Sequence, residues 1–189
     1  MTEAALKRAQ SLTGDSEGRP EDDWYPTDPP YTNALLDRIQ FEGRIWEPAC
    51  GDGMMVNTLR ERGYQVIASD LNDHGCPGAK VGLDFTRVPE RPMVENIITN
   101  PPFKIGIDFA RKANACATRS VALLCKLAFL AGVNRSVMHE ETHLTRVLVF
   151  RARPKFGRGG KKYKNGGMIE FAWFYWEKGY AGKPTVDFI

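Results

Sequence analysis

Residues 47–53, Glu-Pro-Ala-Cys-Gly-Asp-Gly, constrain the fold more than any other part of the sequence. An apolar stretch at 44–49 is typical of a strand, a helical pattern follows at 53–62, and a second strand is expected at 65–70. Glycines between a strand and a helix permit a tight turn in which a ligand can approach the backbone at the helix N-terminus. This βαβ unit predicts a parallel sheet with helical crossovers.

The same alternation of strands and helices continues along the chain. It predicts an α/β, Rossmann-like, doubly wound fold whose seven-stranded sheet is mostly parallel and ends in a C-terminal antiparallel hairpin. The aromatic residues of the last strand are expected to be core. Further strands are expected at 80–85, 96–100, 120–124, 145–151 and 168–176, and helices at 105–117 and 134–141.

Composition sets the size and class of the protein. With 189 residues, 42% of them hydrophobic, the chain suits one α/β core. We expect a flexible N-terminal tail over 1–23 and a single domain over 24–189 with a basic loop at 151–167. No apolar run spans a bilayer and no signal peptide is visible, so a soluble, cytoplasmic protein with no membrane partner is expected. The four cysteines lack metal-ligand or disulfide spacing, and no metal is expected.

Asp70 supports a nucleoside site beside the glycine turn. It ends the strand that follows the turn, where a carboxylate can accept hydrogen bonds from both ribose hydroxyls. A dinucleotide site normally has a third glycine, and Val56 stands at that position. The pattern therefore favours a nucleoside ligand without a pyrophosphate.

Residues 100–103, Asn-Pro-Pro-Phe, form the second motif and directly follow the strand expected at 96–100. The rigid prolines place the Asn100 amide and a free backbone carbonyl at the carboxyl end of that strand, next to the Phe103 ring. Two acceptors and a stacking ring suit a planar base that bears an amino group.

Taken in order, these motifs resemble the amino-group DNA methyltransferases, especially the small phage or prophage adenine-specific enzymes. The resemblance covers nearly everything from residue 24 onward and implies a Rossmann-like class I methyltransferase fold with S-adenosylmethionine as cofactor. It implies that Thr27 and the loop 51–53 hold the methionine part, Asp70 the ribose, and Asp84 with Phe85 the adenine. The cofactor-binding residues carried over are Tyr25, Pro26, Thr27, Glu47, Ala49, Cys50, Gly51, Gly53, Asp70, Leu71, Asp84 and Phe85.

The resemblance also implies a catalytic set of Asn100, Pro101, Pro102 and Phe103. Asn100 and the Pro101 carbonyl would accept hydrogen bonds from the target amine, and Phe103 would stack on a base swung out of the helix. Related enzymes usually carry a target-recognition domain after this motif, but only about 85 residues follow it here. We therefore expect relaxed sequence specificity.

Residues 28–31, Asp-Pro-Pro-Tyr, match another form of the catalytic tetrapeptide. No strand is expected before them, so we assign them to the cofactor-side segment. Residues 139–143, His-Glu-Glu-Thr-His, fit the zinc-peptidase pattern, but the only other histidine is His74, in a Gly/Pro-rich turn. We expect a solvated helix terminus at 139–143.

A basic loop suggests a polyanionic partner. Residues 1–40 carry more acidic than basic side chains, whereas the charged side chains of residues 111–164 are mostly lysine and arginine. Basic groups release counterions from phosphates, so the loop predicts contact with duplex or single-stranded DNA. The expected DNA-binding residues are Arg151, Arg153, Lys155, Arg158, Lys161, Lys162 and Lys164.

The sequence is compatible with several methyl acceptors. Adenine in RNA, the cytosine amine and a protein glutamine amide each present a planar amine to the same tetrapeptide. By resemblance, Asn100 with Phe103 favours adenine, and the basic loop disfavours a protein substrate. A nucleic-acid-binding module that kept the fold without activity also fits the pattern.

Overall fold

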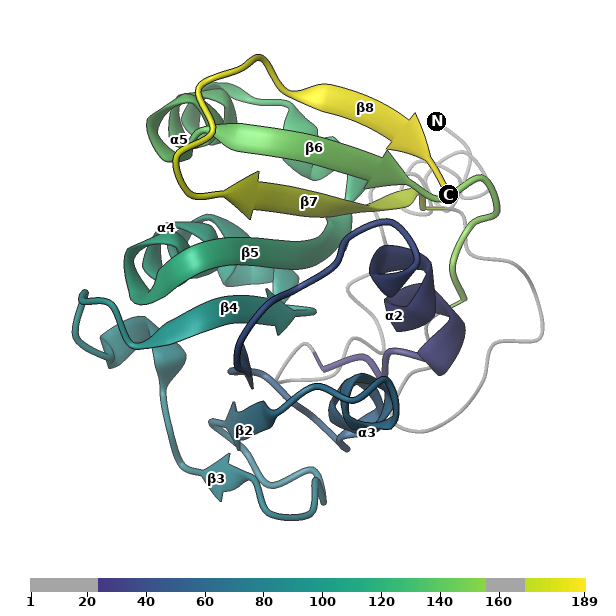
Figure 1. The fold of residues 1–189 in the computed structure, drawn as a ribbon, viewed down its shortest axis with the longest axis vertical. Coiled ribbons are helices and arrows are strands. Elements are labelled where there is room, and N and C mark those ends of the chain that lie inside the picture. The colour runs from purple at the N-terminus through teal and green to yellow at the C-terminus, as the bar shows by residue number, and fades with distance from the viewer. Residues whose placement is uncertain (1–23, 156–168) are drawn as a thin grey trace, which may run out of the picture.

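A computed structural model describes residues 24–155 and 169–189 (Figure 1). Eight strands form one sheet in the order β3-β2-β1-β4-β5-β7-β6-β8. The strands are β1 (Ile45–Glu47), β2 (Val66–Asp70), β3 (Lys80–Val81), β4 (Val94–Thr99), β5 (Ala117–Lys126), β6 (Leu144–Val149), β7 (Phe171–Glu177) and β8 (Thr185–Phe188). The helices are α2 (Pro29–Leu36), α3 (Met54–Glu61), α4 (Gly106–Cys116) and α5 (Val133–Thr142), with 3₁₀ turns η1 (Phe85–Arg87), η2 (Phe103–Ile105) and η3 (Leu127–Leu130).

The sheet is parallel from β3 to β5 and antiparallel around β7. Strand β1 pairs in parallel with β2 on one side and β4 on the other, and β4 pairs in parallel with β5. Strand β7 runs antiparallel to both β5 and β6, which confirms the expected antiparallel C-terminal hairpin on a mostly parallel sheet. The expected fold class is therefore confirmed.

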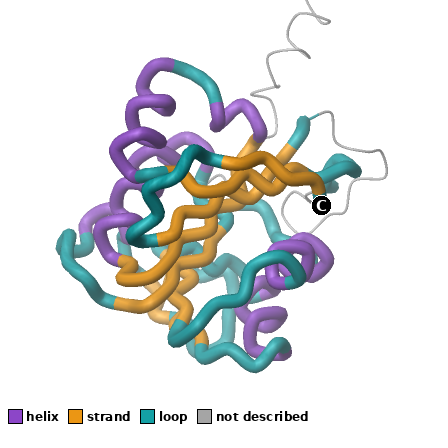
Figure 2. Tube along the Cα trace, turned by 45° about the horizontal axis from the view of Figure 1, so that its top comes forward, coloured by secondary structure: helices purple, strands orange, loops and turns teal. Residues whose placement is uncertain are grey.

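Helices cover both faces of the sheet, with α2 and α3 on one side and α4 and α5 on the other (Figure 2). Successive residues of a central strand enter opposite core layers, as period-two alternation requires. In β5, Leu123 packs in the α4–α5 layer and Leu124 in the α2–α3 layer. The aromatic strand β7 contributes Phe174 to the first layer and Trp173 to the second, so its residues are core as expected.

Three elements differ from those expected. Helix α2 begins directly after Asp28, with prolines in its first turn, where the missing amide hydrogen is tolerated. Strand β8 adds an eighth strand, parallel to β6. Strand β3 ends at Val81 because Gly82 takes a positive φ of 79° and turns the chain out of the sheet, so the strand expected at 80–85 is shorter than predicted. No helix within 24–155 or 169–189 is long and apolar enough to cross a bilayer.

Candidate active site

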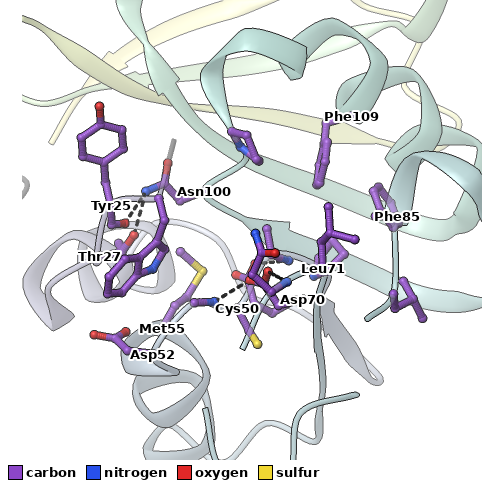
Figure 3. Close-up of a pocket in the computed structure, with 18 of the residues that line it drawn as sticks. Tyr25, Thr27, Cys50, Asp52, Met55, Asp70, Leu71, Phe85, Asn100 and Phe109 are labelled. Carbon is purple, nitrogen blue, oxygen red and sulfur yellow. Dashed lines mark hydrogen bonds between the residues drawn. The ribbon is translucent and has the colours of Figure 1, made fainter. Parts of the chain in front are cut away.

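A cavity of about 250 Å³ lies at the carboxyl ends of β1, β2 and β4 (Figure 3). The chain winds toward β2 on one side of β1 and toward β4 on the other, so the cavity is at the topological switch point, where ligands of α/β sheets bind. Most predicted site residues meet in its lining: Tyr25, Pro26, Thr27, Glu47, Ala49, Cys50, Gly51, Asp70, Leu71, Asp84, Phe85, Asn100 and Pro102. Gly53, Pro101 and Phe103 are predicted site residues that do not line it.

The cavity also includes residues that the motifs did not identify. Ile105 and Phe109 stand four positions apart at the start of α4, a spacing that places side chains on one helical face and could have pointed to them. Trp24 directly precedes the predicted cofactor segment, but no motif singles it out. The remaining additions are Pro48, Asp52, Met55, Asn72, Leu83 and Lys104.

The glycine turn and Asp70 form one braced unit. Gly51 and Gly53 adopt positive φ of 54° and 85°, a conformation that side chains with a Cβ rarely adopt. The Gly51 N–H donates to Asp70 Oδ2 at 2.9 Å, and the Asn72 N–H donates to Asp70 Oδ1 at 2.9 Å. Each carboxylate oxygen retains a lone pair, so Asp70 both holds the turn and can accept from a ribose hydroxyl.

Glu47 is a buried carboxyl at the end of β1. Its pKa is raised to about 8: burial is the main cause, the Thr99 hydroxyl and the Ala49 N–H oppose it, and the charge of Asp70 adds a smaller rise. Its Oε1 accepts from the Ala49 N–H at 3.1 Å. Its Oε2 and the Thr99 hydroxyl do not reach hydrogen-bond geometry, with each other or with any described residue. The cavity wall therefore holds a carboxyl that is largely protonated at neutral pH.

Asp84 and Phe85 form the far wall of the cavity. Asp84 Oδ1 accepts from the Thr86 hydroxyl at 2.6 Å and from the Thr86 N–H at 2.9 Å, which caps η1. The Thr86 hydroxyl lowers the pKa of Asp84 most, and the nearby Arg87 lowers it further. Phe85 packs edge-on against Trp46, so the apolar end of the cavity is rigid.

Asn100 follows β4 and faces the cavity with its amide orientation fixed. Its Nδ2 donates to the Tyr25 carbonyl oxygen at 3.2 Å and to the Thr27 hydroxyl at 3.0 Å (Figure 3). A carbonyl oxygen only accepts, so the nitrogen must be the atom that faces Tyr25. The opposite atom, Oδ1, is buried and has no hydrogen-bond partner among the described residues.

The other residues of the second motif follow Asn100 in the chain and differ in their surroundings. Pro101 is buried, Pro102 lines the cavity, and Phe103 begins η2 outside it. The Phe103 ring stacks on Tyr25 with centroids 5.6 Å apart, and Lys126 Nζ lies 5.1 Å from its centroid. The ring therefore stacks on a protein side chain in this structure.

Three of the predicted DNA-binding residues lie in the described part of the chain, after β6. Arg151 lies over the Phe188 ring at 5.5 Å, and Arg153 pairs with Glu170 at 2.7 Å. The Lys155 N–H donates to the Tyr31 hydroxyl at 2.8 Å. The other four, Arg158, Lys161, Lys162 and Lys164, are outside the described residues.

The zinc-peptidase pattern does not form a metal site. His139 is buried, donates from Nε2 to the Phe129 carbonyl at 2.9 Å and stacks on Phe174 at 5.7 Å. His143 takes a left-handed φ of 57° after the last turn of α5. The expected solvated helix terminus is therefore wrong for His139, whose ring fills the core. Among the described residues, no group of three or more potential ligands could hold a metal ion.

Cys50 lies in the cavity wall as a free thiol. Burial raises its pKa, with a further contribution from the neighbouring Cys76. A thiol whose pKa is raised is a poor nucleophile at neutral pH. The raised pKa therefore disfavours Cys50 as a nucleophile.

No protein-family model and no curated protein sequence matches the chain. Among solved structures, a proposed class I S-adenosylmethionine-dependent methyltransferase from Listeria monocytogenes aligns with a TM-score of 0.62 and 14% identity, over 98% of this chain and 72% of that one. A proposed RNA methyltransferase from Pyrococcus horikoshii gives 0.61 and 15%, over 94% and 98% of the two chains.

A third similar structure is the modification subunit of a proposed type I restriction enzyme from Vibrio vulnificus, with a TM-score of 0.59 and 14% identity. It matches 96% of this chain, which spans only 48% of that subunit. At these identities the likeness establishes the fold: this chain has the Rossmann-like fold of class I methyltransferases.

Proposed function

We propose that the protein transfers a methyl group from S-adenosylmethionine to the exocyclic amine of adenine in DNA. The Asn100 amide carries this proposal, because its nitrogen is held by Tyr25 and Thr27 while its buried oxygen has no partner. A buried acceptor without a donor costs about 1–3 kcal/mol. The amine of a base supplies the missing donor.

The cavity lining suits a cationic nucleoside. Apart from the protonated Glu47, its acidic side chains are Asp52, Asp70 and Asp84, against one basic side chain, Lys104, among the described lining residues. The open backbone of the glycine turn, together with Thr27, would hold the methionine part. Asp70 would hold the ribose, and Asp84 with Phe85 the adenine, at the apolar end of the cavity.

The reaction needs a hydrogen-bond acceptor beside the amine rather than a general base. When bound, S-adenosylmethionine supplies a methyl group activated by its sulfonium sulfur. The lone pair of the adenine amine is delocalised into the ring, so acceptors at Asn100 Oδ1 and the Pro101 carbonyl favour a pyramidal nitrogen. They also stabilise the positive charge that develops on it. A neutral amide cannot take the proton, which leaves to water after transfer.

DNA as the substrate rests on the surroundings of Asn100. Phe103 and Tyr25 stack on each other, and if an extruded base replaced this contact it would stack on their rings and offset an unstacking cost of a few kcal/mol. Arg151, Arg153 and Lys155 begin the basic loop and supply charge for phosphates. One similar structure is named as the modification subunit of a proposed type I restriction enzyme, and another as a proposed RNA methyltransferase, which is the rival acceptor. The described residues after Phe103 complete the sheet and its helices, so we propose relaxed specificity set by one to three flanking bases.

Tritiated methyl transfer to matched duplex DNA, single-stranded DNA and RNA, followed by nucleoside analysis, tests the proposal. We expect N6-methyladenine from DNA. Tritium found only in RNA, or only on cytosine, would show that the methyl acceptor is not adenine in DNA. Cofactor binding without turnover on any substrate would favour a nucleic-acid-binding module.

Methylation mapping tests the proposed specificity. We expect modified adenines with preferences limited to the adjacent bases. A strict site of about six base pairs would contradict relaxed specificity, because reading that length requires a dedicated set of contacts in the major groove.

A further inference from the structure

We infer that Tyr31 is a positioning residue, which holds the start of the basic loop (residues 151–155) beside the acceptor side of the site so that its cations meet nucleic-acid phosphates. This inference rests on the proposed DNA substrate. It gives a role to residues 28–31, Asp-Pro-Pro-Tyr, none of which lines the cavity.

The Tyr31 side chain contacts the start of the basic loop and the residue before it. Its hydroxyl oxygen accepts a hydrogen bond from the Lys155 N–H at 2.8 Å, and its ring packs edge-on against Phe150 with centroids 5.6 Å apart. Its backbone is held as well, because the Tyr31 carbonyl oxygen accepts from the Trp173 indole N–H at 2.9 Å. Tyr31 thus joins helix α2 to strand β7 and to the segment that follows β6 (Figure 1).

A short, restricted segment connects Tyr31 to the catalytic amide. The Tyr25 carbonyl and the Thr27 hydroxyl accept hydrogen bonds from Asn100 Nδ2. The two prolines that follow fix their own φ angles, and the Tyr31 N–H donates to the Asp28 carbonyl at 3.0 Å. One segment therefore orients the acceptor amide at its beginning and holds the basic loop at its end.

The start of the loop directs its basic side chains to solvent. Arg151, Arg153 and Lys155 are exposed, whereas Pro154 is buried. Arg153 also pairs with Glu170 at 2.7 Å, and because both side chains are exposed, a phosphate can replace the carboxylate at little cost. Cations on an anchored backbone lose less entropy on binding phosphates than cations on a segment that must first be ordered.

This part of the loop begins next to the ring of the catalytic motif. Phe103 packs on Phe171, the first residue of β7, with centroids 5.6 Å apart, and Glu170 directly precedes Phe171. Lys126, which pairs with Phe171 across the sheet, places its Nζ 5.1 Å from the Phe103 centroid. A strand that delivers its adenine to the catalytic amide therefore carries its phosphates past Lys126 and Arg153.

Fluorescence anisotropy with a labelled, adenine-containing oligonucleotide, as a duplex and as a single strand, tests this inference on the full chain. Tyr31→Phe retains the ring and every charge of the protein and removes the hydroxyl that accepts from Lys155. We expect DNA to bind about fivefold more weakly at low salt, the effect of about one hydrogen bond.

The salt dependence of binding separates positioning from a merely structural contact. The slope of log affinity against log salt, measured between about 50 and 200 mM NaCl, should become shallower in Tyr31→Phe by about 0.9 for each duplex phosphate contact that is lost. The substitution changes no charge, so a shallower slope requires that existing cations have moved away from phosphates.

Tyr180→Phe is the matched control, because the Tyr180 hydroxyl also makes a hydrogen bond, to the Lys183 carbonyl at 2.7 Å, but in the loop between β7 and β8. It should leave the affinity for DNA and the salt slope unchanged. Wild-type affinity in Tyr31→Phe, or weaker binding with the wild-type slope, would overturn the positioning role while wild-type binding still supports DNA as the substrate. If the wild type binds no DNA, the proposed substrate fails and this inference fails with it.

Discussion

The cofactor side of the cavity and its acceptor side are built in different ways. On the cofactor side, Asp70 and Asp84 accept hydrogen bonds from backbone N–H groups, and Gly51 is fixed by one of these bonds. On the acceptor side, the Phe103 ring stacks on Tyr25, and the Asn100 amide is oriented by the Tyr25 carbonyl and the Thr27 hydroxyl. Backbone bonds preserve one geometry for an invariant ligand, whereas stacked side chains can move apart for an incoming base.

Replacing Asn100 should produce the largest effect on catalysis. Asn100→Ala removes the acceptor proposed to stabilise charge on the amine, and we expect kcat to fall about 100- to 1,000-fold. The affinity for S-adenosylmethionine should fall by at most about tenfold, because the amide reaches the cofactor side only through its hydrogen bond to the Thr27 hydroxyl. Single-turnover methylation and calorimetry measure the two quantities.

Asn114→Ala is the control for that substitution. Asn114 is also buried with an unpaired Oδ1, but it lies on α4 outside the cavity. It should leave kcat unchanged. If Asn100→Ala methylates at the wild-type rate, the proposed catalytic assignment is wrong.

Removing the Asp70 carboxylate should weaken cofactor binding, because Asp70 holds the glycine turn. Asp70→Ala releases the N–H groups of Gly51 and Asn72 and the proposed ribose contact, so we expect S-adenosylmethionine to bind about 10- to 100-fold more weakly. Asp73→Ala is the matched control, because Asp73 also accepts a backbone N–H, from Gly75, but does not line the cavity. Similar losses in both variants would show that only the loop fold matters.

Glu47 makes stability depend on pH. Its pKa in the folded protein is about 8, above its ordinary value of 4.5, so between these values the folded state holds a proton that the unfolded state has released. The free energy of unfolding therefore falls as pH rises, by about 1.4 kcal/mol per pH unit for one such group. In Glu47→Gln this part of the decline should vanish. Urea unfolding of both proteins at pH 5, 6.5 and 8 measures the difference, and parallel pH profiles would contradict it.

The smallest effect is expected at the basic loop on the acceptor side. Arg153→Ala should weaken duplex DNA binding a few-fold at low salt and reduce the salt slope by about 0.9 if Arg153 contacts one phosphate. Arg146→Ala removes the same charge from β6, where Arg146 pairs with Asp187 at 2.9 Å, and should leave the slope unchanged. Equal salt slopes for the two variants would show that the loop contributes only to the net charge and makes no specific phosphate contact.

Much of the site on the cofactor side was predictable from local sequence. A strand, a glycine turn and a helix, followed by a strand that ends in Asp70, can form only a few parallel arrangements, and all place the strand ends on one edge. The Asn-Pro-Pro-Phe motif after β4 then joins that edge. Helix α2 was missed because two prolines disfavour most helical positions but are tolerated in the first turn. Strand β8 was missed because its polar–apolar alternation covers only four residues, the shortest run in which that pattern indicates a strand, and its pairing with β6 is decided by tertiary structure.

By itself, the sequence determined the α/β fold class and the placing of the glycine turn, Asp70 and Asn100 at strand ends, because these follow from local periodicity and strand direction. The other predicted residues of the cavity lining came from the resemblance to amino-group methyltransferases. Tertiary structure alone decided which side chains meet across the cavity. It placed Trp24 on Gly51, Tyr25 against Phe103, and His139 in the core. Each of these contacts joins separate elements of the fold, and their geometry depends on how whole elements pack rather than on any local pattern.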